Sequence, residues 1–86
     1  MISHQKVRAI LKKNKFRVVH YIPASICSRF VGGDIIVNQP CKGSVHVSLY
    51  RKKDVELLRN IKNCLRDNLD CSIALYDNYL IVTENN

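Results

Sequence analysis

Two histidines and two cysteines are the side chains of this chain that could together bind a metal ion. A zinc site needs four converging nitrogen or sulfur ligands, and its usual sequence sign is a close cysteine pair. The chain has four cysteines but no C-x-x-C pair, so a zinc set is conceivable only from separate segments: His20, Cys27, Cys41 and His46. We interpret these cysteines as loop thiols and these histidines as strand residues, and we predict no metal and no other cofactor.

A short polar segment holds the residue types of a nucleophilic enzyme, namely Ser25, Cys27 and Ser28. Such a nucleophile needs a neighbouring base, for which His20 and His46 are the candidates. The spacing matches no motif that builds an oxyanion hole or a nucleophile elbow. We therefore predict that the chain is not an enzyme.

Basic residues form the strongest pattern in the sequence. Lys and Arg number 14 against 7 Asp and Glu, which gives a formal net charge of +7. The first 33 residues contain seven basic residues and no acid, whereas residues 67–86 contain four acids and no Lys or Arg. This asymmetry predicts a basic surface that faces an acidic partner.

The predicted basic surface comes from two expected helices and the segments beside them. Phosphate contacts need point charges and tolerate loose spacing. Three cations of the second helix, Arg59, Lys62 and Arg66, recur at i, i+3 and i+7, and this spacing places them in one stripe. A solvated helix face is the plain alternative. The residues expected to bind a nucleic acid or an acidic partner are Lys6, Arg8, Lys12, Lys13, Lys15, Arg17, Arg51, Lys52, Lys53, Arg59, Lys62 and Arg66.

Aromatic side chains stack on nucleobases in many proteins that bind single strands. Tyr76 and Tyr79 flank an expected hairpin turn, but they are separated in charge from the basic half of the chain. His46 and Tyr50, on the expected polar side of a strand, are better placed. The sequence does not specifically support base stacking.

These observations lead to two functional hypotheses. The first is a small non-enzymatic nucleic-acid-binding domain that contacts phosphates, with DNA favoured over RNA. The alternative is a phage-type inhibitor or adaptor that docks its basic face on an acidic protein or on a nucleic-acid-binding site. A homodimer formed through an exposed sheet edge is a further option.

The expected location is the cytoplasm, with reduced thiols. No apolar run approaches the roughly 20 residues that span a bilayer, and the N-terminal residues lack the apolar core of a signal peptide. We therefore expect no membrane partner.

The N-terminal half is expected to begin with a helix. Ser3 is suited to cap this helix, which should end near Asn14. Residues 16–22 are rich in β-branched and aromatic side chains and predict a strand that ends at Pro23. The following segment is expected to be an irregular loop or a short strand around residues 26–31.

The C-terminal half has clearer local patterns. Residues 34–38 and 44–50 predict a hairpin joined by a loop, residues 39–43. Asp54 should start a second helix that runs from Val55 to about Asn68.

A second hairpin is expected to close the chain. Two apolar segments, residues 71–76 and 79–84, flank Asp77 and Asn78. A two-residue turn there would pair Leu75 with Leu80 and Ile73 with Val82.

The predicted fold is one α+β domain over residues 1–86. It consists of a small single-layer antiparallel sheet of four to five strands packed against two helices, in the order α-β-β-β-α-β-β.

Overall fold

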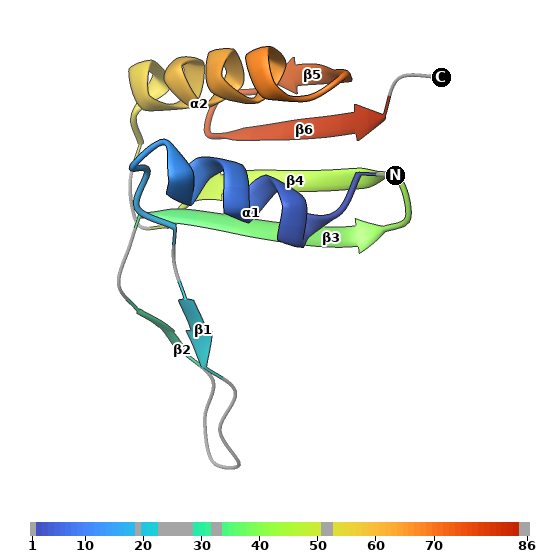
Figure 1. Cartoon of the computed structure of the whole chain (residues 1–86). Coiled ribbons are helices and arrows are strands. Elements are labelled where there is room, and N and C mark those ends of the chain that lie inside the picture. Colours follow the sequence, from blue (N-terminus) through green and yellow to red (C-terminus); the bar gives the residue numbers. More distant parts are fainter. Residues whose placement is uncertain (1, 19, 23–28, 32–33, 51–52, 85–86) are drawn as a thin grey trace.

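Two helices cover one face of a four-stranded antiparallel sheet in the described part of the chain (Figure 1). The structure is a computed structural model that describes residues 2–18, 20–22, 29–31, 34–50 and 53–84. The strand order is β3-β4-β6-β5, so that β4 and β6 are central and β3 and β5 form the edges. The predicted α+β class, with an antiparallel sheet packed on two helices, is confirmed.

Helix α1 (His4–Lys13) begins at the predicted cap. The Ser3 hydroxyl accepts a hydrogen bond from the Lys6 backbone N–H at 3.2 Å, which satisfies one of the free donors at a helix start. Val7 and Leu11 are buried on the side of α1 that faces the sheet. The cations of α1 lie on the other sides of the helix.

The end of α1 is fixed by two backbone hydrogen bonds. The Lys15 N–H donates to the Lys12 carbonyl at 3.0 Å, and the Phe16 N–H donates to the Leu11 carbonyl at 2.9 Å. This is the Schellman pattern, in which the residue after the cap adopts a left-handed conformation. Lys15 has a φ of 68° there, although glycine is the usual residue at this position.

The prediction of a strand over residues 16–22 is wrong in its first part. Strand β1 (His20–Ile22) pairs with β2 (Arg29–Val31) in a separate two-stranded sheet that extends away from the two layers in Figure 1. Val18 makes an isolated parallel bridge to Ile35, and Phe16 is held by the end of α1. Strand β2 agrees with the short strand that was one of two alternatives for residues 26–31, and the predicted order α-β-β-β-α-β-β lacks it.

The first hairpin of the main sheet has a longer first strand than predicted. Strand β3 (Ile35–Cys41) continues through Pro40, with a register shift between Asn38 and Cys41. An edge strand tolerates this because one side of its backbone has no ladder to lose. Strand β4 (Ser44–Leu49) follows a two-residue turn in which Gly43 has a φ of 82°.

Helix α2 (Val55–Asn68) is followed by the hairpin of β5 (Cys71–Leu75) and β6 (Tyr79–Glu84). The Asp54 carboxylate caps α2 by accepting from the Leu57 N–H at 3.0 Å. The predicted pairing of Leu75 with Leu80 and of Ile73 with Val82 is confirmed.

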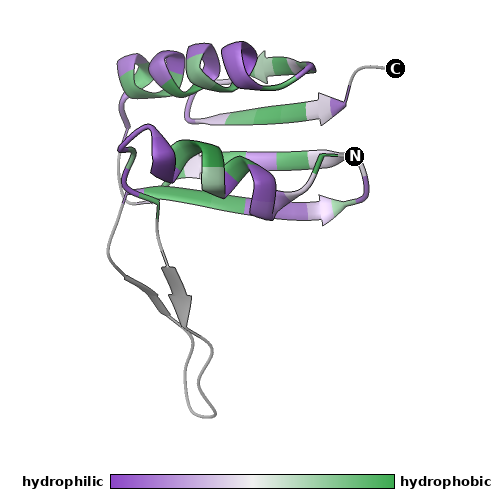
Figure 2. Ribbon diagram, in the orientation of Figure 1, coloured by the Kyte–Doolittle hydropathy of each residue, from purple (hydrophilic) through white to green (hydrophobic). Residues whose placement is uncertain are grey.

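The core lies between the helices and one face of the sheet. In Figure 2 hydrophobic and hydrophilic residues alternate along both helices, as expected for helices with one buried side. Each strand of the sheet likewise alternates between a face toward the helices and an open face. The buried core residues are Ile2, Val7, Leu11, Val18, Ile35, Val37, Val45, Val47, Leu49, Leu58, Ile61, Leu65, Leu80 and Val82.

Among the described residues, neither helix is long and apolar enough to cross a lipid bilayer.

Candidate nucleic-acid interface

Helix α1 and the segment after it carry the densest group of cations. Lys6, Lys12, Lys13 and Lys15 are exposed, and Arg8 is half-buried. At 100° per residue, Lys6 and Lys13 lie on one flank of the buried Val7–Leu11 side, and Arg8 and Lys12 lie on the other. With Arg17 these residues form the α1 cluster: Lys6, Arg8, Lys12, Lys13, Lys15 and Arg17.

Arg17 lies in the connection after α1 and not in a strand, which corrects its predicted placement. Its carbonyl accepts hydrogen bonds from the backbone N–H groups of Asp34 at 2.9 Å and Ile35 at 3.1 Å. Its guanidinium lies 3.7 Å from the Asp34 carboxylate, and its side chain is 71% exposed. An exposed pair at this distance is weak, so the guanidinium can exchange Asp34 for another anion.

Two of the three α2 cations that were predicted to form one exposed stripe are exposed, and the helix also carries acids. Arg59 and Arg66 are exposed and Lys62 is half-buried. The Arg66 guanidinium donates to the Asn63 side-chain oxygen at 3.1 Å. The exposed acids of the same helix are Glu56 and Asp67.

The cations between β4 and α2 are described in part. Lys53 is exposed, two residues before α2. Arg51 and Lys52 lie outside the described residues. Lys42, which is not among the predicted binding residues, is exposed in the β3–β4 turn.

The main sheet joins two halves of unequal charge. Residues 1–50 contain eight Lys or Arg and one acid, whereas residues 51–86 contain six Lys or Arg and six acids. Each half supplies one helix and one hairpin of the main sheet, and the two halves meet at the β4–β6 pair. The sequence asymmetry therefore becomes a spatial one, with the basic side at α1 and β3.

The open face of the sheet carries hydroxyl, amide, aliphatic and aromatic side chains. Three rings lie close together on it: Tyr76 and Tyr79 have centroids 4.7 Å apart, and His46 and Tyr79 have centroids 6.5 Å apart. Tyr76 and Tyr79 belong to the half with more acids. The α1 cluster lies in the other half and on the helix side, so the structure does not join the rings and the α1 cluster into one surface.

The residues considered for metal binding and catalysis do not form a described site. Cys27, Ser25 and Ser28 lie outside the described residues. Cys41 is an exposed free thiol, and no group of three or more metal-ligating side chains is found in the part of the chain that the structure describes.

Two other described thiols pack against the core. Cys64 and Cys71 are free and half-buried. Burial raises the pKa of the Cys64 thiol, and the neighbouring Asp67 carboxylate raises it further. Burial also raises the pKa of Cys71, with a further contribution from Asp70. Since the thiolate is the nucleophile, both effects argue against a catalytic role.

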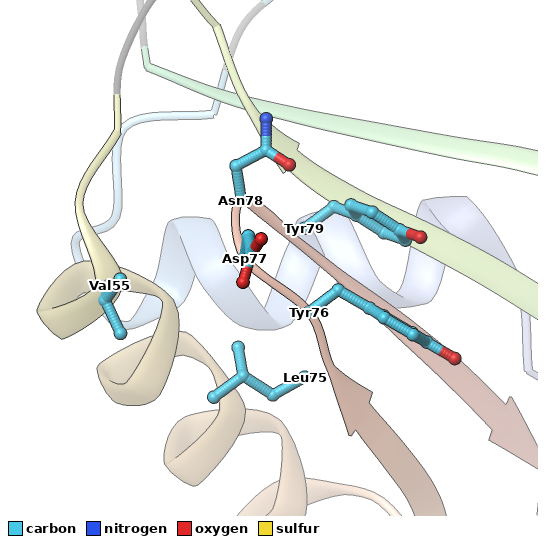
Figure 3. A pocket seen from close by; sticks show the side chains of 6 residues that line it. All are labelled: Val55, Leu75, Tyr76, Asp77, Asn78 and Tyr79. Carbon is cyan, nitrogen blue, oxygen red and sulfur yellow. The ribbon is translucent and has the colours of Figure 1, made fainter.

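A hollow of about 540 Å³ lies where the β5–β6 turn meets the start of α2 (Figure 3). It includes Val55 and Tyr76, which are 47% and 46% exposed, and the carboxylate of Asp77. Among the residues that the structure describes, no lysine or arginine lines it. Its lining residues are Val55, Leu75, Tyr76, Asp77, Asn78 and Tyr79.

Comparison with protein-family models, with curated proteins and with solved structures gives no match for this chain.

Proposed function

We propose that the chain is a small non-enzymatic nucleic-acid-binding domain that contacts phosphates through the α1 cluster. The observation that carries this proposal is the unequal charge of the halves: residues 1–50, which include α1, carry eight Lys or Arg and one acid, Asp34. Duplex DNA is the favoured form, because cations on a helix surface match a regular row of phosphates and the sequence-independent contact needs no base readout.

The two helices contribute unequally to the proposed phosphate binding. On α2 the acids Glu56 and Asp67 lie beside Arg59 and Arg66, and they repel the same phosphates that the cations attract. The α1 cluster has no such neighbours on its own helix. The α2 cations therefore contribute less than their number suggests.

A matched pair of variants tests this assignment. One variant carries Lys12→Glu and Lys13→Glu, and the other carries Arg59→Glu and Arg66→Glu, so both change the net charge equally. Binding to labelled duplex DNA, single-stranded DNA and RNA is measured over a salt series. We expect affinity to fall steeply with salt, with each phosphate contact contributing about 0.9 to the logarithmic slope on duplex DNA.

The outcomes separate the hypotheses. We expect the α1 variant to lose most of its affinity and to show a shallower salt slope, while the α2 variant retains most of both. Equal losses would show that total charge and not the α1 cluster determines binding. Absence of binding at low salt would reject the proposal and leave the acidic protein partner as the working hypothesis.

A further inference from the structure

The two edges of the main sheet differ in their protection against strand pairing. Edge strand β3 contains Pro40 and a register shift, and both hinder addition of another strand. Edge strand β5 reads CSIAL, with no proline and no charge, and it pairs with β6 without a shift. In natural proteins an edge of this kind is normally protected or used for pairing.

The backbone groups that β5 directs outward follow from its register with β6. The Tyr76 N–H donates to the Tyr79 carbonyl at 2.9 Å, so this pair is hydrogen-bonded. Hydrogen-bonded and non-hydrogen-bonded pairs alternate in an antiparallel ladder. The backbone groups of Ala74 and Ser72 therefore point toward β6, and those of Cys71, Ile73 and Leu75 point to the outer side.

Charge also favours β5 over β3 as a meeting point of two copies. Two identical chains of net charge +7 repel each other, and they do so least where their basic halves are far apart. A contact at β5 brings together the two C-terminal halves, in which acids and cations are equal in number, and places the two α1 clusters at the outer ends. The two large hydrophobic residues that are exposed in the described part of the chain, Val55 and Tyr76, lie beside the end of β5.

We propose that the outer edge of β5 binds the β5 edge of a second copy, which joins the two sheets into one antiparallel sheet. Two-fold symmetry centred on Ile73 pairs Ile73 with the same residue of the second copy and Cys71 with Leu75. This register uses the outward N–H and C=O groups of all three residues on each chain. Ser72 of one copy then lies directly opposite Ala74 of the other, on the open face.

The test uses these opposed positions. Ser72 and Ala74 are exposed in the single chain, so substitutions there leave the core intact. Ser72→Lys with Ala74→Lys places like charges opposite each other and prevents pairing. Ser72→Glu with Ala74→Lys places opposite charges there and allows it. A matched control, Asn38→Lys with Ser44→Lys, adds two charges to the same face near β3.

Sedimentation equilibrium over a concentration series measures the outcome, with far-UV circular dichroism to verify folding. We expect the unaltered chain, the control and the charge-paired variant to form dimers, and the double lysine variant to stay monomeric. A monomeric unaltered chain, or a dimer that survives the double lysine change, would overturn the proposal.

Discussion

Tyr76 and Tyr79 stack with ring centroids 4.7 Å apart and 12° between their planes (Figure 3). The rings close the β5–β6 hairpin above the hydrogen bond from the Tyr76 N–H to the Tyr79 carbonyl, on either side of Asp77 and Asn78. Cross-strand aromatic pairs of this geometry stabilise a sheet beyond the area that they bury. The pair therefore supports the register of the edge strand.

A double-mutant cycle measures this stabilisation. Tyr76→Ala, Tyr79→Ala and the double variant are unfolded with urea. We expect a coupling free energy of about 0.5 to 1.5 kcal/mol. Tyr79→Ala should be the more destabilising single change, because Tyr79 lies in a central strand and is half-buried whereas Tyr76 is exposed. Additive effects of the two substitutions would mean that the ring contact contributes nothing.

The C-terminal part of the fold could be predicted from sequence because its signals are local. The helical period of α2, its Asp54 cap and the two-residue turn at Asp77 and Asn78 each determine structure within a few residues. These signals also fixed the pairing of Leu75 with Leu80, because a slip by one residue would turn the apolar side chains to the open face.

The segment after α1 could not be predicted in the same way. Phe16 has strand propensity, but its N–H is taken by the Leu11 carbonyl and its side chain packs against the core. Pro40 indicates a loop, yet it lies in a strand because β3 is an edge, and strand order is a tertiary property. Tertiary contacts override local preference at both residues.

The residues of the candidate site could be predicted from the sequence, but their arrangement on the surface could not. All cations can be read from the sequence, but the way in which the basic half and the half with most of the acids meet depends on the β4–β6 pairing. The weaker position of Arg59 depends on the exposure of its neighbour Glu56.

Replacement of Lys15 by glycine should stabilise the fold. It adopts a φ of 68° in the Schellman turn, where a β-carbon is strained. We expect Lys15→Gly to raise the free energy of unfolding by roughly 0.5 to 1 kcal/mol, measured by urea denaturation. Lys15→Ala is the control, since it removes the same charge and keeps the β-carbon. Equal stability of the two variants would contradict this account of the turn.

The Gln39 side chain ties the start of α1 to β3. Its carbonyl accepts from the His4 N–H at 3.1 Å, and its amide donates to the Ile2 carbonyl at 3.3 Å. We expect Gln39→Ala to lower the free energy of unfolding by about 1 to 2 kcal/mol, because two partly buried hydrogen bonds are lost. Amide hydrogen exchange at His4 should accelerate in the same variant.

A conservative variant separates the two bonds of Gln39. Gln39→Glu keeps an acceptor for the His4 N–H and loses the donor to Ile2. Its exchange rate at His4 should lie between those of the unaltered chain and Gln39→Ala. An exchange rate at His4 that is unchanged in Gln39→Ala would show that the side chain does not hold the helix start.

The three described thiols should react with iodoacetamide at different rates, which peptide mass spectrometry can follow. Cys41 is exposed and should be alkylated first. Cys64 and Cys71 should lag, because burial restricts access and raises the pKa of both thiols. A raised pKa leaves less thiolate at neutral pH, so the alkylation rates of both thiols should continue to increase as the pH rises above the ordinary pKa range of a thiol.

Asp67→Asn tests the contribution of the neighbouring carboxylate to the pKa of Cys64. The substitution removes the charge that helps to raise this pKa, so the alkylation of Cys64 should accelerate. Cys71, whose carboxylate neighbour is Asp70, should keep its rate. Equal acceleration of both thiols would instead indicate a general loosening of the fold.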